Sequence, residues 1–343
     1  MPEHGPTAFE SLLGRVCGGD DLSFEEMASA VDAIMDGRCN DAQVAMLLTA
    51  LRAKGESVEE VAGAAAALRK HMTPIPTQRK GVLDTCGTGG DGSRTFNIST
   101  AAALVTAAAG VPVAKHGNRA VTSRTGSADV LTDLGVNIQA DVACVSRCLD
   151  ELGICFCFAP LLHPAMKRVS EIRKKLGVPT VFNLLGPLSN PAGAEFQLLG
   201  VGKPELRRLL AEALALLGTR RALVVCGDDG LDEVTLAGRT NVSEAAAGGV
   251  KDFAWMPEDF GLPWLHREEL LVSGPAESAA MIRGILQGQP GGPRDIVVAN
   301  AAAGLWTAGK SASLTDCVTL VTQAIDSGAA RELLARLVQL TNN

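Results

Sequence analysis

A glycine-rich stretch at residues 84–100 holds the densest group of side chains that could do chemistry. It follows a short apolar run that is typical of a strand, and the apolar residues from Ala101 onward predict a helix capped by Asn97, Ser99 or Thr100. Glycines let a ligand approach bare backbone N–H groups, and a helix N-terminus adds unpaired donors and a favourable dipole. The stretch therefore predicts an anion site, most often one for phosphate.

The stretch matches neither of the two common glycine fingerprints. It lacks the Gly-Lys-Ser/Thr ending of a P-loop, and its glycines do not follow the dinucleotide-binding spacing. A plain structural turn is the alternative, because glycine often punctuates a chain. Asp91, Asn97, Ser99 and Thr100 favour a ligand site, since a turn alone would not need these four polar groups.

A second candidate anion loop covers residues 115–129. It follows the strand-like run 111–114 and contains Lys115, Asn118, Arg119 and several hydroxyl groups. Either cation alone would more often be ordinary surface charge. Because ligands of open α/β sheets bind at such strand ends, the two loops together predict one ligand that carries two phosphate groups.

A third polar stretch, residues 158–173, contains two arginines that could bind a carboxylate. The guanidinium group of Arg168 or Arg173 can grip a carboxylate with two parallel hydrogen bonds. The stretch therefore favours a second, carboxylate-bearing ligand. A lone histidine such as His116 or His163 is more often a packed or turn residue than a catalytic base.

An acidic turn at residues 227–235 follows the strand-like run 222–226 and contains Asp228, Asp229, Asp232 and Glu233. Hard oxygen ligands without cysteine or histidine suit Mg²⁺, which keeps several waters and is usually completed by substrate phosphates. A solvated acidic turn is the alternative. The phosphate-binding loops favour the magnesium site, because such a site needs a cation.

The composition limits the class of protein. The chain has 343 residues, is 47% hydrophobic and carries a net charge of -7, which predicts a large core and argues against nucleic-acid or anionic-membrane partners. Its nine cysteines include no Cys-x-x-Cys pair, which is typical of buried, reduced thiols. No secretory signal opens the sequence and no apolar run approaches the ~20 residues of a membrane span, so a soluble, cytoplasmic protein is expected.

The elements that position these stretches fall into two groups. Residues 7–72 read as helices, with capping-box patterns at Ser23 and Ser57 and a possible cap at Asn40. A proline-stiffened linker follows at residues 73–78. Beyond the linker, strand-like runs alternate with helical patterns, and helices alone return after about residue 276. This order predicts an α/β fold, with a small N-terminal helical domain and a large α/β domain around a mostly parallel central sheet.

We place the helical domain at residues 1–75, with a returning helical segment near 165–190, and the α/β domain at residues 80–343. The stretch at residues 183–193, which is rich in glycine and proline, could shape a pocket wall. It is equally well explained as a hinge between the two parts.

Seven blocks, in order along the chain, resemble the anthranilate phosphoribosyltransferases, and the resemblance extends over essentially the whole sequence. The blocks are residues 87–92, 97–100, 115–119, 126–129, 163–166, 183–187 and 230–233. The resemblance implies the fold of the pyrimidine nucleoside phosphorylases, an active site in the cleft between the domains and a homodimer formed through the helical domain. It implies that the amine of anthranilate displaces pyrophosphate from phosphoribosyl pyrophosphate (PRPP), a step of tryptophan biosynthesis, with two Mg²⁺ ions on the donor.

The resemblance also implies roles for individual residues. The PRPP site would comprise Gly87, Gly90, Asp91, Thr95, Asn97, Ile98, Ser99, Thr100, Lys115, His116, Gly117, Asn118, Arg119, Ala120, Val121, Thr122, Ser123 and Ser127. The anthranilate contacts would be Gly87, Asn118, His163 and Arg173. The magnesium ligands would be Ser99, Asp232 and Glu233, and the catalytic residues Lys115, Asp232 and Glu233.

Two other functions stay open at this point. A nucleoside phosphorylase with the same fold would bind inorganic phosphate and a nucleoside, and would need neither the pair Asp232 and Glu233 nor a carboxylate-binding Arg173. A non-enzymatic relative that binds nucleic acid should show a basic surface and a degraded third stretch. The net charge of -7 and the intact 163–173 run argue against it.

Overall fold

The computed structural model describes residues 8–89, 92–119 and 125–343. Its N-terminal part is a bundle of helices, namely α1 (Ala8–Cys17), α2 (Phe24–Met35), α3 (Asp41–Lys54) and α4 (Val58–Lys70). The capping boxes predicted at Ser23 and Ser57 are both present, and Asn40 caps α3. Local sequence signals therefore set the helix starts in this part of the chain.

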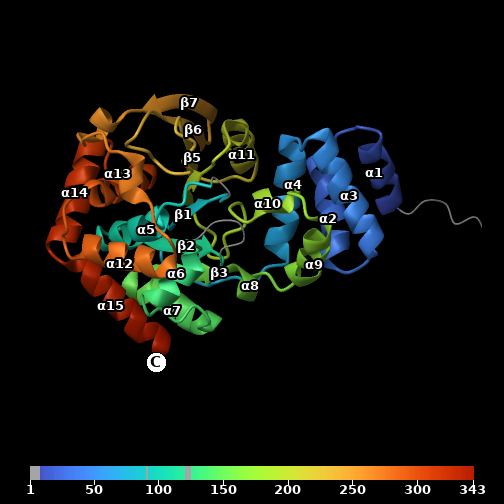
Figure 1. The fold of residues 1–343 in the computed structure, drawn as a ribbon. Helices are drawn as coiled ribbons and strands as arrows, with labels where there is room; N and C mark the ends of the chain where they lie inside the picture. The colour runs from blue at the N-terminus through green and yellow to red at the C-terminus, as the bar shows by residue number, and fades with distance from the viewer. Residues whose placement is uncertain (1–7, 90–91, 120–124) are drawn as a thin grey trace, which may run out of the picture.

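A mixed sheet lies at the centre of the larger part (Figure 1). In the described residues its strands run in the order β3 (Ile154–Phe158), β2 (Val113–Gly117), β1 (Leu83–Gly87), β4 (Phe196–Gly200), β5 (Arg221–Gly227), β6 (Thr240–Ala246) and β7 (Gly249–Trp255). The first five strands are parallel, while β6 and β7 pair antiparallel to their neighbours. The expected mostly parallel sheet is confirmed. Strands β4, β6 and β7 were not among the elements expected from the sequence.

Helices cover both faces of the sheet. One face shares a core with α5 (Ile98–Ala108), α6 (Ser127–Asp133), α7 (Val142–Leu152), α12 (Pro275–Leu286), α13 (Gly292–Thr307), α14 (Leu314–Asp326) and α15 (Ala329–Asn342). The other face shares a core with α11 (Pro204–Leu216) and the N-terminal bundle. Alternate strand residues serve the two cores, as the pleat requires: Leu198 and Leu223 belong to the first, Leu199 and Val224 to the second.

The chain returns to the bundle after β3. Helix α8 (Ala159–Leu162) follows that strand, α9 (Met166–Leu176) then packs on α3, and α10 (Phe182–Leu185) packs on α4, beside which it lies in Figure 1. Two short 3₁₀ helices, Pro257–Phe260 and Arg267–Leu270, precede α12. The elements at residues 166–185 therefore pack on the bundle between the end of β3 and the start of β4.

All nine cysteines lie in the described residues and are free thiols, as expected. Seven of them are buried, while Cys17 is exposed and Cys144 is partly exposed. Among the described residues, none of the helices combines the length and the apolar character that a membrane crossing requires.

Glu60 ties three segments of the bundle together. Its fully buried carboxylate accepts hydrogen bonds from the backbone N–H groups of Leu22 (3.0 Å) and Ser57 (2.8 Å). It also pairs with the ammonium group of Lys54 at 2.8 Å. A buried carboxylate is tolerated only when such donors replace its lost hydration.

We expect Glu60→Gln to lower the free energy of unfolding by about 1.5–3 kcal/mol, because the amide keeps one acceptor oxygen but loses the charge-assisted bonds. Urea unfolding followed by far-ultraviolet circular dichroism measures the change. The control is Glu59→Gln at the exposed neighbouring position, which should stay within about 0.5 kcal/mol of the parent protein. Equal losses in the two variants would show that the buried Glu60 carboxylate contributes no more to the free energy of unfolding than an exposed one.

Candidate functional site

Glycines at the ends of three parallel strands let other segments come close. A Cβ atom at Gly87 would lie 2.7 Å from an Asp232 carboxylate oxygen, and one at Gly200 would lie 1.6 Å from the Asp232 carbonyl oxygen. A Cβ atom at Gly117 would lie 2.1 Å from the hydroxyl oxygen of Ser127. Side chains at these positions would therefore push the acidic turn and the second loop away from the strand ends.

The first anion loop leads into α5 as the sequence indicates. Asn97 is the N-cap of α5, because its side-chain oxygen accepts the N–H of Thr100 at 3.1 Å. Within the first turn of the helix, the N–H of Ser99 donates to a carboxylate oxygen of Glu233 at 3.0 Å. Thr95 and Ile98 are buried beside this helix start. The predicted helix N-terminus is confirmed, and the acidic turn lies directly against it.

Lys115 links the two loops at the end of β2. Its ammonium group donates to the carbonyl oxygen of Thr85 at 2.5 Å and to the hydroxyl of Ser99 at 3.0 Å. The residue is only 3% exposed. Burial lowers the pKa of Lys115, while the negative charges of Asp84, Glu233 and Asp232 oppose that shift. The structure thus brings a cation, a hydroxyl group and a carboxylate together at one helix start.

The four carboxylates of the acidic turn divide into two pairs. Asp228 accepts from the amide of Asn241 at 2.6 Å, and Asp229 accepts from the hydroxyl of Thr235 at 3.0 Å, so these two hold the turn. Asp232 and Glu233 instead face Gly87 and the start of α5. Within the described ranges there is no group of three or more His, Cys, Asp or Glu residues arranged for a metal ion. A hard cation here would need further oxygens from water and ligand, which is how Mg²⁺ is usually bound.

His116 and His163 form a buried, neutral pair. His116 Nδ1 lies 2.9 Å from the carbonyl oxygen of Gly186 and must donate to it, because a carbonyl only accepts. Burial, and then repulsion from His163, lowers the pKa of His116 to about 3. Burial likewise lowers the pKa of His163 to about 4. Since neutral His116 offers only a lone pair at Nε2, the 3.2 Å contact between the Nε2 atoms requires His163 to donate.

The two candidate arginines of α9 have different surroundings. Arg168 pairs with Asp41 at 2.9 Å and donates to the carbonyl oxygen of Cys39 at 2.6 Å, so it is engaged with the bundle. Arg173 is half-buried, and burial lowers its pKa. Its guanidinium group has no hydrogen-bond or ion-pair partner in the part of the chain that the structure describes. Arg173 is therefore the one of these two that remains available for a carboxylate ligand.

The remaining predicted residues lie at the second loop or outside the described ranges. Asn118 accepts the N–H of Arg119 at 2.7 Å on its side-chain oxygen, its carbonyl oxygen accepts the Ser127 hydroxyl at 3.4 Å, and exposed Arg119 pairs with Asp129 at 2.8 Å. The other six predicted PRPP residues fall outside the described residues; they are Gly90, Asp91, Ala120, Val121, Thr122 and Ser123.

Sequence reasoning overlooked two residues of the site. Asp84 is completely buried and accepts the backbone N–H of His116 at 3.1 Å, which ties β1 to β2 just below the loops. Gly200 admits the Asp232 backbone. A weak signal for Gly200 was present, because it directly follows the apolar pair Leu198 and Leu199.

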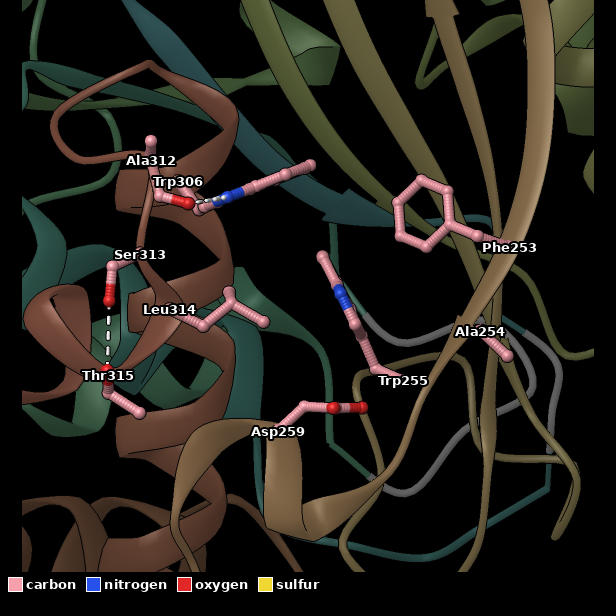
Figure 2. Close-up of a pocket in the computed structure, with 9 residues that line it drawn as sticks. All are labelled: Phe253, Ala254, Trp255, Asp259, Trp306, Ala312, Ser313, Leu314 and Thr315. Atoms are coloured by element: carbon pink, nitrogen blue, oxygen red, sulfur yellow. Dashed lines mark hydrogen bonds between the residues drawn. The ribbon is translucent and has the colours of Figure 1, made fainter.

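A separate pocket of about 350 Å³ lies between β7 and the α13–α14 connection (Figure 2). Phe253, Trp255 and Trp306 form its aromatic wall, and Asp259 lines its rim. None of the candidate residues lines this pocket. The aromatic rings pack edge to face on one another, which is a packing arrangement rather than a polar site.

Comparison with known proteins agrees with this geometry. The α/β domain of the glycosyl transferase family matches residues 79–331, and the helical bundle domain of the same family matches residues 10–72. The anthranilate phosphoribosyltransferase of Rhodopirellula baltica is 51% identical over 332 residues, which covers 97% of each chain.

Two solved structures show the same architecture. The anthranilate phosphoribosyltransferase of Thermus thermophilus is 45% identical, with a TM-score of 0.91 over 97% of this chain and 99% of that one. The Saccharomyces cerevisiae anthranilate phosphoribosyltransferase in complex with PRPP and Mg is 30% identical, with a TM-score of 0.88 over 97% and 98% of the two chains. With identity and fold shared over nearly the full length, the chain belongs to the anthranilate phosphoribosyltransferases of the glycosyl transferase family.

Proposed function

We propose that the chain transfers the phosphoribosyl group of PRPP to the amine of anthranilate in tryptophan biosynthesis. The products are N-(5-phosphoribosyl)anthranilate and pyrophosphate. The observation that carries this proposal is the meeting of Lys115, Ser99 and Glu233 at the N-terminus of α5. It places a cation, the positive end of a helix dipole and a carboxylate where a magnesium-bound pyrophosphate would be held.

The donor site comprises the two loops at the ends of β1 and β2. Its members are the PRPP residues named from the sequence, from Gly87 to Thr100 and from Lys115 to Ser127. The yeast relative in complex with PRPP and Mg supports this assignment. Asp232, Glu233 and the Ser99 hydroxyl are the oxygen ligands that would hold magnesium, and two ions on the pyrophosphate fit a site with so few protein ligands.

The step that most needs stabilisation is the departure of pyrophosphate. Breaking the C1–O bond builds positive charge on the ribose and negative charge on the pyrophosphate. Lys115 and the positive end of the α5 helix dipole stabilise that negative charge where it develops. Asp232 and Glu233 would hold magnesium, which would supply Lewis-acid stabilisation of negative charge on the leaving group.

The acceptor side provides orientation. Arg173 binds the anthranilate carboxylate, and His163, Asn118 and Gly87 line the rest of the acceptor site. An aromatic amine is a free-base nucleophile at neutral pH, so the site needs to place its nitrogen in line with C1. Orientation of this kind is worth up to ~7–11 kcal/mol in favourable cases. The neutral histidine pair shapes the site without acting as an obligatory base.

The same family membership supports three statements about organisation. We propose a helical domain at residues 1–75 with a returning segment near 165–190, and an α/β domain at residues 80–343. The family matches at residues 10–72 and 79–331 and the packing of α9 on α3 support this division. We further propose a homodimer formed through the helical domain, and a cytoplasmic location.

We expect Glu233→Gln to lower kcat by about 10²-fold or more, because the site loses a charge that holds magnesium while the amide oxygen can still accept the Ser99 N–H. The measurement is the loss of anthranilate fluorescence with PRPP across a series of Mg²⁺ concentrations. The matched control is Asp228→Asn in the same turn, which should keep at least about half of the activity, since Asp228 only holds the turn. A variant Glu233→Gln with unchanged Mg²⁺ dependence would contradict the assignment.

Arg173→Ala should raise the anthranilate KM by about 10- to 100-fold, which is the range for losing a charge-assisted hydrogen bond. The PRPP KM should change little. Arg168→Ala on the same helix is the control, because Arg168 is engaged with Asp41, and its anthranilate KM should stay within about twofold of the parent value. Similar effects of the two substitutions would remove Arg173 from its proposed role.

Single substitutions His116→Asn and His163→Asn should each leave measurable turnover, because neither ring is needed to accept a proton. A variant that binds both substrates as tightly as the parent protein and shows no turnover would contradict this. The pair should instead affect stability. Its folded pKa values of about 3 and 4 lie below the unfolded value near 6.5, so the unfolded state binds more protons in that window. Folding stability attributable to the pair is therefore lost as the pH falls from about 6.5 towards 4.

Thermal unfolding at pH 7.5 and pH 5 measures this effect for the parent protein and for His163→Asn. We expect the parent to lose more in Tm between the two pH values than the variant does. Equal losses in Tm would show that the lowered pKa values of the buried pair do not cause the pH dependence of stability.

A further inference from the structure

The loop at residues 186–190 ties two strands together through its backbone and one side chain. The carbonyl oxygen of Gly186 accepts from His116 at 2.9 Å, and the side chain of Asn190 donates to the carbonyl oxygen of Ala114 at 2.8 Å. Both bonds attach the loop to β2. The carbonyl oxygen of Pro187 accepts from the side chain of Gln197 on β4 at 2.6 Å. The loop is therefore fixed to the two strands that flank β1.

Arg69, a polar side chain of the bundle, hydrogen-bonds to the same loop. Arg69, in the last turn of α4, donates its Nε–H to the carbonyl oxygen of Leu188 at 2.7 Å. The Leu188 side chain itself is completely buried in the core that the bundle shares with the sheet. Burial lowers the pKa of Arg69, and no neighbouring carboxylate opposes that shift. The hydrogen bond to Leu188 is the only one from the Arg69 side chain within the described residues.

The position of this bond matters because the two substrates are held by different parts of the chain. The donor residues Ser99, Lys115 and Glu233 contact one another within the α/β domain. Arg173 stands on α9, which packs on α3 of the bundle. The 186–190 loop lies between these parts, and it also holds His116, whose ring contacts His163.

We propose that Arg69 is a positioning residue: its bond to Leu188 fixes the 186–190 loop to the bundle and thereby sets where the anthranilate side of the site stands relative to the PRPP side. This inference rests on the proposed function. The guanidinium charge is not what the loop requires, because Leu188 offers a neutral carbonyl to the Nε–H. An uncharged donor at the same point along the side chain should therefore serve as well.

Two substitutions separate the hydrogen bond from the bulk and charge of Arg69. In Arg69→Gln the amide nitrogen occupies the place of Nε along the side chain, so a donor is kept. In Arg69→Met a methyl group occupies that place, so the stem is kept and the donor is lost. We expect Arg69→Met to raise the anthranilate KM by about 3- to 10-fold, the range for one net hydrogen bond. Arg69→Gln should stay within about twofold of the parent value.

PRPP binding distinguishes a positioning role from a merely structural one. General destabilisation would weaken PRPP binding, whereas a shift of the anthranilate side alone would not. Isothermal titration calorimetry with PRPP and Mg²⁺ should give dissociation constants within about twofold for the parent and both variants. Anthranilate binding, followed by its fluorescence in the presence of pyrophosphate and Mg²⁺, should weaken in Arg69→Met in step with the KM. An unchanged anthranilate KM in Arg69→Met overturns the inference. A parallel loss of PRPP affinity and Tm in both variants also overturns it, because it would indicate general destabilisation.

Failure of the proposed function has a different signature. It would appear as no loss of anthranilate fluorescence in the parent protein with PRPP and Mg²⁺, before any variant is compared. In that case the inference falls with the function on which it rests. With an active parent, the comparison of Arg69→Met with Arg69→Gln decides the role of Arg69 alone.

Discussion

The candidate site depends on one close approach of two backbones. The carbonyl oxygen of Asp232 occupies space that a Cβ atom at Gly200 would fill. A chain segment can lie this close to a strand end only where the strand lacks a side chain. The approach brings Glu233 within hydrogen-bond distance of the N-terminus of α5. Without it, the carboxylates would stand away from the anion loops, and no cation could bridge a phosphate to the protein.

The same approach explains why a lysine can be buried at the end of β2. Taking an ammonium group out of water is costly unless nearby charges and acceptors replace the lost hydration. Here the carbonyl oxygen of Thr85 and the hydroxyl of Ser99 accept from Lys115, and Asp84, Glu233 and Asp232 supply negative charge around it. The cation is thereby held in place before any ligand arrives. Preorganised charge of this kind needs little rearrangement when negative charge develops on a leaving group.

The sequence allowed the fold class and most of the site to be predicted, because many signals are local. The cap at Ser23 and the glycine-rich stretch before α5 each act on residues close to them in the sequence. Strands β6 and β7 escaped prediction because the stretch is rich in alanine and charged residues, and their pairing with each other and with β5 makes them strands. Gly200 was overlooked because β4, the strand that it ends, is recognisable mainly from its register with β1 and β5.

The arginines of α9 show what helix geometry could have added to the sequence analysis. Residues five apart in an α-helix point about 140° away from each other. Arg168 and Arg173 therefore could not both have faced one carboxylate, and the structure engages the first with Asp41. Choosing between them required knowing which side of α9 meets the bundle. That information lies in the packing of α9 on α3, which no local pattern encodes.

Under the proposed reaction, the division of the site between two bodies follows from the chemistry. An in-line displacement needs the nucleophile on one side of C1 and the leaving group on the other. The loops at the ends of β1 and β2 surround the leaving group, so the acceptor has to be held from the opposite direction. The chain meets this requirement by leaving the sheet after β3, running along the bundle as α9 and α10, and returning through the 186–190 loop to β4. The segment that carries Arg173 is thus joined at both ends to β3 and β4, the strands that flank β2 and β1 of the donor site, which keeps the two substrates in register.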